Sequence, residues 1–254
     1  MITQLQQHLF KIYYDGNDIV TRFPERPYND FEISHSLNNT IINEFPKKQE
    51  FFEYCIAQGK LNSDKLPIPV NLQEKYNIGY YKPILGLNFH DDYICFSDSL
   101  IKKFKEVKTE ELEFMVAFSF DQNNEIFGIG LRILNSDIVF NAFKWLFPLG
   151  QHCIFGLHDL DNSKEVILVE GFTDYIAARE SGYNNVLGLG SIEITEGHKK
   201  YLPKDRNYKF CYDQDRYGYE MRKVRNECFF SPMEYKDPYE AYINTGKVEF
   251  ILVE

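Results

Sequence analysis

Short hydrophobic runs alternate with more polar, helix-forming segments through the last third of the chain. The runs Val166–Glu170 and Tyr208–Asp213 are apolar and compact, which predicts buried strands, and a third strand is expected at Asn185–Leu189. Helices are expected between and after these strands, at Phe172–Glu180, near Thr195–Tyr201 and from Tyr219 to about Cys228. This alternation is typical of an α/β domain with a parallel sheet and right-handed crossovers.

The middle of the chain has a different pattern. Apolar and polar positions alternate in Phe114–Phe120 and in Glu125–Leu134, and the polar segment Asp121–Asn124 separates them. Two such stretches around a short polar connection predict a β-hairpin. We therefore expect an α+β part that precedes the α/β domain.

Acidic residues follow two of the expected strands. Glu170 ends the first strand and a glycine follows it, so the chain can turn sharply into a helix. Asp213 ends the other strand, and Asp215, two residues on, points to the same side if the chain is extended. Open α/β sheets bind ligands at the carboxyl ends of their strands. Carboxylates side by side repel each other unless a cation lies between them, and oxygen ligands alone suit Mg²⁺ or Mn²⁺.

The composition is that of a folded chain of one large domain or two small ones. Of its 254 residues, 44% are hydrophobic, and it has 18 Tyr and 22 Phe, so it can bury a core. No stretch approaches the roughly 20 apolar residues of a membrane span, and Met1–Tyr14 lacks a signal-peptide pattern, so we expect a cytoplasmic protein without a membrane partner. The five cysteines lie far apart, which argues against a disulfide framework or a structural zinc site. The pair His152 and Cys153 is not expected to bind zinc, because adjacent residues point apart on a strand.

A net charge of -10 over the whole chain argues against a nucleic-acid partner. The distribution of the charged residues along the chain, however, is compatible with such a partner. The segment 199–225 holds nine basic and four acidic residues, so it carries +5 and the rest of the chain carries -15. Basic residues around a metal site can hold phosphates. The alternative is an ordinary solvated helix face, and for Arg222, Lys223 and Arg225 both interpretations stay open.

Four short motifs in a fixed order carry a resemblance to a known family. They are Glu170-Gly-x-x-Asp174, Leu189-Gly190-Ser191, Asp213-x-Asp215-x-x-Gly218 and Lys236-Asp237-Pro238. Together they resemble the TOPRIM domain of bacterial DnaG-type primases. A lone Asp-x-Asp would be weak evidence, but four elements in order, each at a strand end or in the turn after it, are specific.

Weaker similarity extends upstream. In primases a strand ending in Gly-x-x-Arg and then a Lys-Tyr-Leu-Asn stretch lead into the TOPRIM domain, and Gly128–Arg132 and Lys144–Leu146 are similar, although Phe147 replaces the Asn. Leu72–Tyr80 is similar to the start of the primase polymerase core. The resemblance implies a primase-core-like subdomain at 1–113, connecting strands at 114–160 and a TOPRIM domain, Rossmann-like with a parallel sheet, at 161–254.

The resemblance also implies the roles of individual residues. Glu170, Asp213 and Asp215 would be catalytic, and the metal ligands would be Glu170, Asp174, Asp213, Asp215 and Asp237. Contacts to nucleic acid or nucleotide would come from Arg132, Lys144, Gly171, Gly190, Ser191, Arg216 and Gly218. From the residues alone, Arg132 and Lys144 could equally be half-buried basic residues on a sheet edge, and Asp174 could be an acid favoured by the helix dipole.

The chain departs from the family at one motif and in its modules. Primases carry Asp-Pro-Asp where this chain has Asp237-Pro238-Tyr239-Glu240, so one carboxylate is displaced or lost, and Glu240 is a candidate replacement. The zinc-binding and helicase-binding modules of replicative primases are not recognisable. Initiation would then need a partner, either a helicase or a separate zinc-bearing protein.

The function implied is a primase core from a mobile element or phage. It would join ribonucleoside triphosphates on a single-stranded DNA template with Mg²⁺ or Mn²⁺. A TOPRIM nuclease that uses the same carboxylates is the first alternative. A non-catalytic accessory subunit that binds nucleic acid is the second, and the retained Glu170, Asp213 and Asp215 argue against it.

Overall fold

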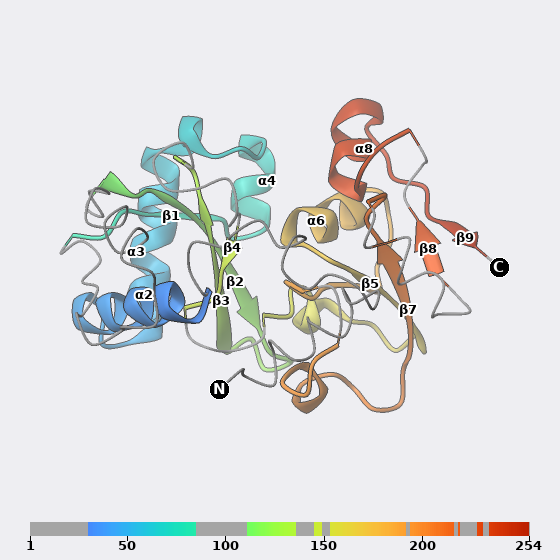
Figure 1. Ribbon diagram of the computed structural model, residues 1–254, viewed down its shortest axis with the longest axis horizontal. Coiled ribbons are helices and arrows are strands. Elements are labelled where there is room, and N and C mark those ends of the chain that lie inside the picture. Colours follow the sequence, from blue (N-terminus) through green and yellow to red (C-terminus); the bar gives the residue numbers. More distant parts are fainter. Residues whose placement is uncertain are drawn as a thin grey trace, which may run out of the picture.

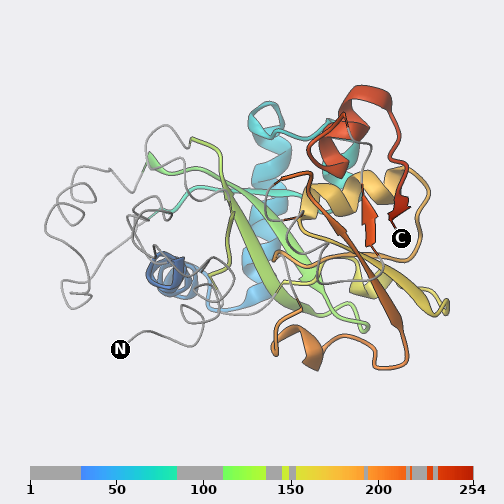
Figure 2. The ribbon, with the colours of Figure 1, turned by 45° about the vertical axis from the view of Figure 1, so that its right-hand side comes forward.

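The computed structural model describes residues 30–84, 111–135, 145–148, 153–191, 194–215, 218, 228–230 and 234–253. Lys144, Arg216 and the start of the helix expected from Tyr219 lie outside these residues, as does His152. The described elements form two parts side by side, each built on its own sheet (Figures 1 and 2).

The N-terminal part is an antiparallel sheet with helices against it. Its strands are β1 (Gly79–Tyr81), β2 (Phe114–Phe120), β3 (Ile126–Ile133) and β4 (Trp145–Leu146), in the order β1-β2-β3-β4. The helical elements are α2 (Asp30–Glu44), α3 (Lys48–Leu61), the 3₁₀ turn η1 (Ser63–Lys65) and α4 (Val70–Lys75). A Cβ on Gly79 would lie 2.7 Å from the Cβ of Cys55, so α3 packs directly against the backbone of β1.

The expected hairpin is confirmed, with β2 and β3 in antiparallel register from Phe114 opposite Ile133 to Phe120 opposite Ile126. Both faces of these strands are buried, unlike the alternation that the sequence suggested. Phe114, Val116 and Phe118 pack with α2 and α3 on one face. Met115 and Ala117 pack on the other face, toward the C-terminal part.

The C-terminal part is a mixed sheet in the order β6-β5-β7-β8-β9. The strands are β5 (Glu165–Val169), β6 (Val186–Gly188), β7 (Asn207–Tyr212), β8 (Cys228–Phe230) and β9 (Ile251–Val253). Strands β6, β5 and β7 are parallel to one another, as expected. Strand β8, which was not expected, runs parallel to β7, and β9 runs antiparallel to β8. The fold class is therefore α/β, with an α+β part before it.

Helix α6 (Phe172–Glu180) has the bounds that the sequence predicts, but other elements differ. The region near Thr195–Tyr201 forms only the 3₁₀ turn η5 (His198–Lys200), because Gly197 disfavours a helix and Pro203 prevents its extension. Cys228 belongs to β8 and not to the end of a helix, so that expectation is wrong. Helix α8 (Pro238–Thr245) and the 3₁₀ turn η4 (Leu157–Asp159) were not expected.

The two parts share a buried core. One cluster combines Met115 and Ala117 of the N-terminal sheet with Val169, Phe172 and Tyr175 of the C-terminal part. The hydroxyl group of Tyr76 donates to Glu180 at 2.5 Å, which ties α4 to α6. The domain boundaries expected at 113/114 and 160/161 stay a prediction, and β1 pairs with β2 across the first of them.

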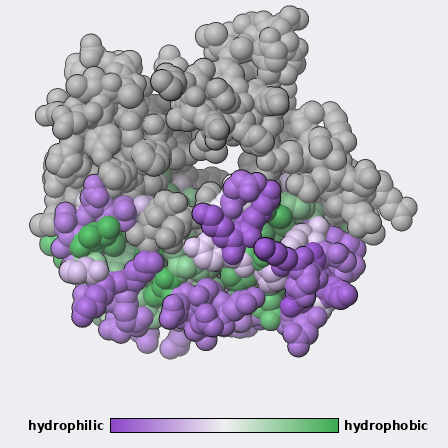
Figure 3. All heavy atoms as spheres, turned by 90° about the horizontal axis from the view of Figure 1, so that it is seen from below, coloured by the Kyte–Doolittle hydropathy of each residue, from purple (hydrophilic) through white to green (hydrophobic). Residues whose placement is uncertain are grey.

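Hydrophilic side chains dominate the described residues on the face seen from below, with small hydrophobic patches between them (Figure 3). In the described part of the chain, no helix combines the length and the apolar character that crossing a membrane requires. Cys55, Cys153 and Cys211 are buried free thiols.

Candidate active site

The carboxyl ends of β5 and β7 bring Glu170 and Asp213 together. The two strands are parallel neighbours, with Val169 opposite Cys211, so both chains leave the sheet at the same edge. The backbone N–H of Asp213 donates to Oε1 of Glu170 at 3.0 Å. This hydrogen bond fixes one oxygen of Glu170 against the end of the neighbouring strand.

Asp174 lies one turn into α6 and is buried, with 6% of its surface exposed. Its Oδ2 accepts from the N–H of Gly171 at 3.1 Å, and its Oδ1 accepts from the N–H of Tyr239 at 3.2 Å. The first bond is the capping expected of an acid in the first helical turn. The second joins α6 to the start of α8, so Asp174 does more than cap its own helix.

Asp215 lies beyond β7 in the turn toward Gly218. Its Oδ1 accepts from the N–H of Gly218 at 2.9 Å. A Cβ on Gly218 would lie 2.0 Å from the carbonyl oxygen of Asp213, so no side chain fits there. Gly218 therefore lets the chain fold back tightly against the acidic residues.

Asp237 is the N-cap of α8, where its Oδ1 accepts from the N–H of Glu240 at 2.8 Å. Pro238 follows in the first turn, where its missing N–H costs no helical bond. Oε2 of Glu240 accepts from the N–H of Lys236 at 2.5 Å. Glu240, the candidate replacement for the missing carboxylate, thus uses one of its oxygens to hold the backbone that leads into the helix.

The carboxylates of this edge raise one another's pKa. Burial and then the charge of Asp213 raise the pKa of Glu170 to about 8. Burial, Asp213 and Asp237 raise the pKa of Asp174 to about 8. Burial and Asp237 raise the pKa of Asp213 to about 6, although Lys236 opposes this. We call Glu170, Asp174, Asp213, Asp215 and Asp237 the acidic cluster.

A cation suits the acidic cluster, because it would offset the charge that now raises these pKa values. All five side chains offer oxygen, which is the ligand type of Mg²⁺ and Mn²⁺. Several of these oxygens already accept backbone N–H groups. Among the described residues, no three acidic, His or Cys side chains converge in an arrangement ready to coordinate an ion.

The other expected contact residues take different positions. Gly190 follows β6 with a φ of +61°, and the half-buried Ser191 comes next. Gly171 is the N-cap of α6. Arg132 is half-buried on β3, paired with Met115 on one side and Trp145 on the other. Burial raises the pKa of Tyr239 and the charge of Arg132 lowers it, so the two side chains are close enough to interact electrostatically.

Two residues of this region were not singled out from the sequence. Lys236 forms an ion pair with Asp213, with Nζ 3.7 Å from Oδ2. Tyr239 donates its backbone N–H to Asp174, and its hydroxyl group donates to the carbonyl oxygen of Pro67 at 3.0 Å. The Lys-Asp-Pro motif pointed to the place, but nothing in it indicated these contacts.

The parallel sheet with carboxylates at its strand ends, packed on an antiparallel sheet, resembles the TOPRIM and primase-core arrangement that the sequence motifs suggested. Comparison with known proteins supports this resemblance. Residues 167–229 match a family model described as Toprim-like. TOPRIM and primase domains generally depend on metal ions.

Curated relatives are similar over part of the chain. The DNA primase of Listeria monocytogenes is 33% identical over 112 residues, which are 42% of this chain and 16% of that protein. The Twinkle homolog protein, chloroplastic/mitochondrial, of Arabidopsis thaliana is 29% identical over 108 residues, 41% of this chain and 14% of that protein. The chain thus spans only a small part of the length of these relatives.

Among solved structures, the DnaG primase catalytic domain bound to ssDNA covers 83% of this chain and 75% of its own, with a TM-score of 0.51 and 16% identity. The RNA polymerase domain of Mycobacterium tuberculosis DnaG, in complex with a double-stranded DNA oligomer with an overhang, has a TM-score of 0.50 at 14% identity, covering 88% and 79%. The chain therefore has the fold of a DnaG-type primase catalytic core, in both of its parts.

Proposed function

We propose that this chain is a DnaG-like primase core that joins ribonucleotides on single-stranded DNA. The observation that carries the proposal is the acidic cluster at the strand ends of a DnaG-type fold, where burial and mutual repulsion raise three carboxyl pKa values. Uncompensated like charges in a folded protein are costly unless a ligand uses them.

Asp213 and Asp215 would hold Mg²⁺ or Mn²⁺, with Glu170 beside them and Asp174 and Asp237 completing the set. The bound ion would neutralise charge on the phosphates and align them for transfer. Glu170 would be suited to take the proton of the attacking 3′-hydroxyl group on Oε2, because Oε1 already accepts from the backbone N–H of Asp213.

The template and the nucleotide would contact the other candidate residues. Arg132 lies near enough to Tyr239 of α8 to affect its pKa, and the N-cap of α8 belongs to the acidic cluster, so single-stranded DNA held by Arg132 would lie near the site. Gly171, Gly190, Ser191 and Gly218 border the same edge, where backbone can approach phosphate closely. For Lys144 and Arg216 we propose contacts to nucleic acid or nucleotide, as the motif resemblance implies.

The main rival is a nuclease with the same carboxylates and metal. The N-terminal part favours the polymerase, because the DnaG catalytic domain whose structure includes ssDNA matches this chain over both parts. An accessory subunit without activity would have no use for the acidic cluster. A partner helicase, a separate zinc-bearing initiation protein and an origin in a mobile element or phage remain hypotheses.

One assay separates these functions. Purified protein is incubated with single-stranded DNA, labelled ribonucleotides and Mg²⁺ or Mn²⁺, and products are resolved on a gel. We expect labelled oligoribonucleotides that depend on template, and none with Asp213→Asn. Template cutting without nucleotides, with no incorporation in either metal, would instead favour the nuclease.

Binding is tested separately from chemistry. Arg132→Ala should weaken binding to single-stranded DNA and reduce the salt dependence by about one counterion, because one phosphate contact is lost. Lys247→Ala is the matched control, since Lys247 is exposed and paired with Glu249. Equal affinities and salt slopes for the two variants would remove Arg132 from the template surface.

A further inference from the structure

The backbone of Lys236 is held on both sides. Its N–H donates to Oε2 of Glu240 at 2.5 Å, and its carbonyl oxygen accepts from the N–H of Gln214 at 2.6 Å. Gln214 lies between Asp213 and Asp215, and Glu240 is in the first turn of α8. The root of the Lys236 side chain is therefore fixed beside the acidic cluster, by bonds that do not involve its ammonium group.

The ammonium group lies among the carboxylates. Nζ is 3.7 Å from Oδ2 of Asp213, whose side chain is only 15% exposed. Lys236 directly precedes Asp237 in the chain, so its side chain begins beside a second member of the acidic cluster. The position of the backbone and the ion pair together place the ammonium group at the cluster.

The ammonium group of Lys236 can also move away from Asp213. Half of its surface is exposed, and 3.7 Å is long for a hydrogen-bonded ion pair, so the contact is a weak one that solvent reaches. A fixed root with a loosely held charged end is the geometry of a counter-ion that another cation can replace.

We propose that Lys236 is a tethered counter-ion of the acidic cluster, and that a divalent cation binds by displacing its ammonium group from Asp213. This inference rests on the metal site of the proposed function. The ammonium group stabilises the metal-free protein, and its displacement lowers the apparent affinity for the ion. Lys236 would then be a positioning residue that sets the metal concentration at which the site fills.

The test measures metal binding and not turnover. Mn²⁺ is titrated into the full chain, and the free ion is followed by electron paramagnetic resonance. Lys236→Met keeps the length of the apolar stem and removes the charge. We expect the Kd for Mn²⁺ to fall about five- to tenfold, because a positive charge close to the ion is lost at a solvent-accessible site. Lys236→Arg should stay within about twofold of the wild type, because the charge remains.

Controls make each outcome decisive. Lys247→Met removes an equal charge from an exposed position away from the acidic cluster, and should leave the Kd unchanged. Lys236→Gln serves as a second neutral variant, and circular dichroism checks that each variant is folded. If neutral variants bind Mn²⁺ as the wild type does, or more weakly, the counter-ion role is wrong. If the wild type shows no binding that Asp213→Asn removes, the proposed metal site itself fails.

Discussion

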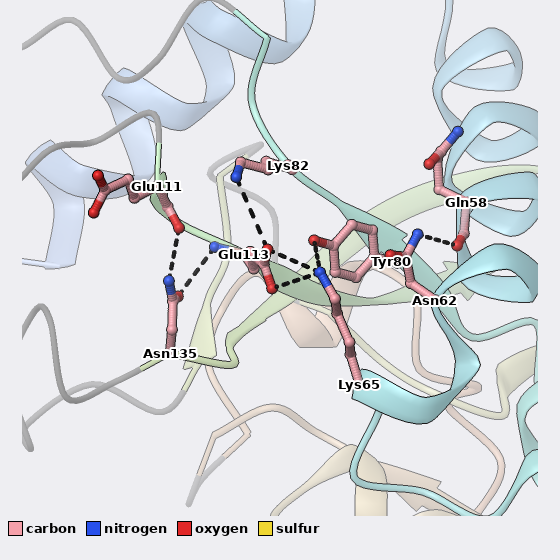
Figure 4. Close-up of polar contacts among 8 residues, drawn as sticks. All are labelled: Gln58, Asn62, Lys65, Tyr80, Lys82, Glu111, Glu113 and Asn135. Carbon is pink, nitrogen blue, oxygen red and sulfur yellow. Dashed lines mark hydrogen bonds and ion pairs between the residues drawn. The ribbon is translucent and has the colours of Figure 1, made fainter.

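Two charged clusters in this molecule are built from similar residues and behave in opposite ways. In the N-terminal part, Glu113 accepts from Lys65 at 3.0 Å, and Lys82 lies 3.9 Å away (Figure 4). Lys65 also donates to the hydroxyl group of Tyr80 at 3.3 Å. One carboxylate is shared by two ammonium groups, and we call these four residues the balanced cluster. In the acidic cluster, Lys236 forms an ion pair with only one of the five carboxylates, that of Asp213.

The pKa values of the carboxylates shift in opposite directions in the two clusters. Burial alone would raise the pKa of Glu113, but hydrogen bonds from Lys65 and Tyr80 outweigh it, so the pKa is lowered. The pKa values of Glu170 and Asp174 are raised to about 8. Charges that pair with one another stabilise a fold, whereas carboxylates in excess, with raised pKa values, make a region a candidate functional site. Chemical composition alone does not separate the two kinds of cluster.

The largest effect is expected when charge is removed from the acidic cluster at constant side-chain volume. Asp213→Asn or Glu170→Gln should lower turnover at least about a hundredfold, because the metal loses a ligand. The metal-free protein should keep its fold and melt at a higher temperature, since repulsion is relieved. Primer synthesis and thermal unfolding measure the two effects. Wild-type activity in either variant would refute the assigned chemistry.

The pH dependence of stability should have opposite signs for the two clusters. Raised carboxyl pKa values mean that the folded state holds more protons than the unfolded state from about pH 4 to about pH 8. The metal-free protein should therefore lose stability as pH rises through this window, and less so in Asp213→Asn. Glu113, with a lowered pKa, contributes stability above its ordinary value that is lost as pH falls below it.

Thermal unfolding from pH 4 to pH 9, with and without Mn²⁺, tests this sign. Mn²⁺ binds the deprotonated carboxylates, so it should restore the stability that the metal-free protein loses at high pH. A wild-type melting temperature that rises steadily with pH in the absence of metal would contradict the electrostatics of the acidic cluster.

A smaller effect is expected when the balanced cluster is altered. Glu113→Gln should destabilise the fold by about 1 kcal/mol, since Lys65 and Lys82 lose their shared partner near the surface. Mn²⁺ affinity should not change. Urea unfolding and the Mn²⁺ titration measure both, with the exposed Glu249→Gln as control. A change in Mn²⁺ affinity comparable to that of Asp213→Asn would show that the balanced cluster also affects metal binding, and the two clusters would then not differ in function.

The smallest expected effect concerns the link between the parts. Tyr239→Phe removes only the hydroxyl group that donates to Pro67, and should cost about 0.5–1 kcal/mol in urea unfolding. The backbone bond from residue 239 to Asp174 should survive. Tyr242→Phe, on the same helix, is the comparison variant. Equal stability of the two variants would mean that the bond to Pro67 contributes nothing.

The sequence predicted the parallel strands, the hairpin, α6 and the resemblance to a primase core, because periodic apolar runs and strand-end motifs are local signals. It did not predict α8, although Asp237, Pro238 and Gly246 carry ordinary capping signals at its ends. The short strands β8 and β9 are three residues each, too short for a periodicity to be recognised.

The contacts of the site depended on tertiary structure in the same way. That Glu170 and Asp213 would meet followed from the parallel order of their strands. That Lys236 would face Asp213, and that Tyr239 would reach Pro67 across 172 positions of the chain, did not. Both contacts depend on where α8 packs in the folded protein, and no local sequence pattern indicates that packing.

Trp145 is the one tryptophan of the chain, and its place between the two parts makes it an intrinsic fluorophore at a known position. It pairs with Arg132 on the N-terminal sheet and packs edge-on against Phe172, the first residue of α6, at 6.0 Å between ring centroids. Its emission comes from the junction beside the acidic edge. Unlabelled wild-type protein can therefore report, in real time, when metal or DNA changes the packing between the parts.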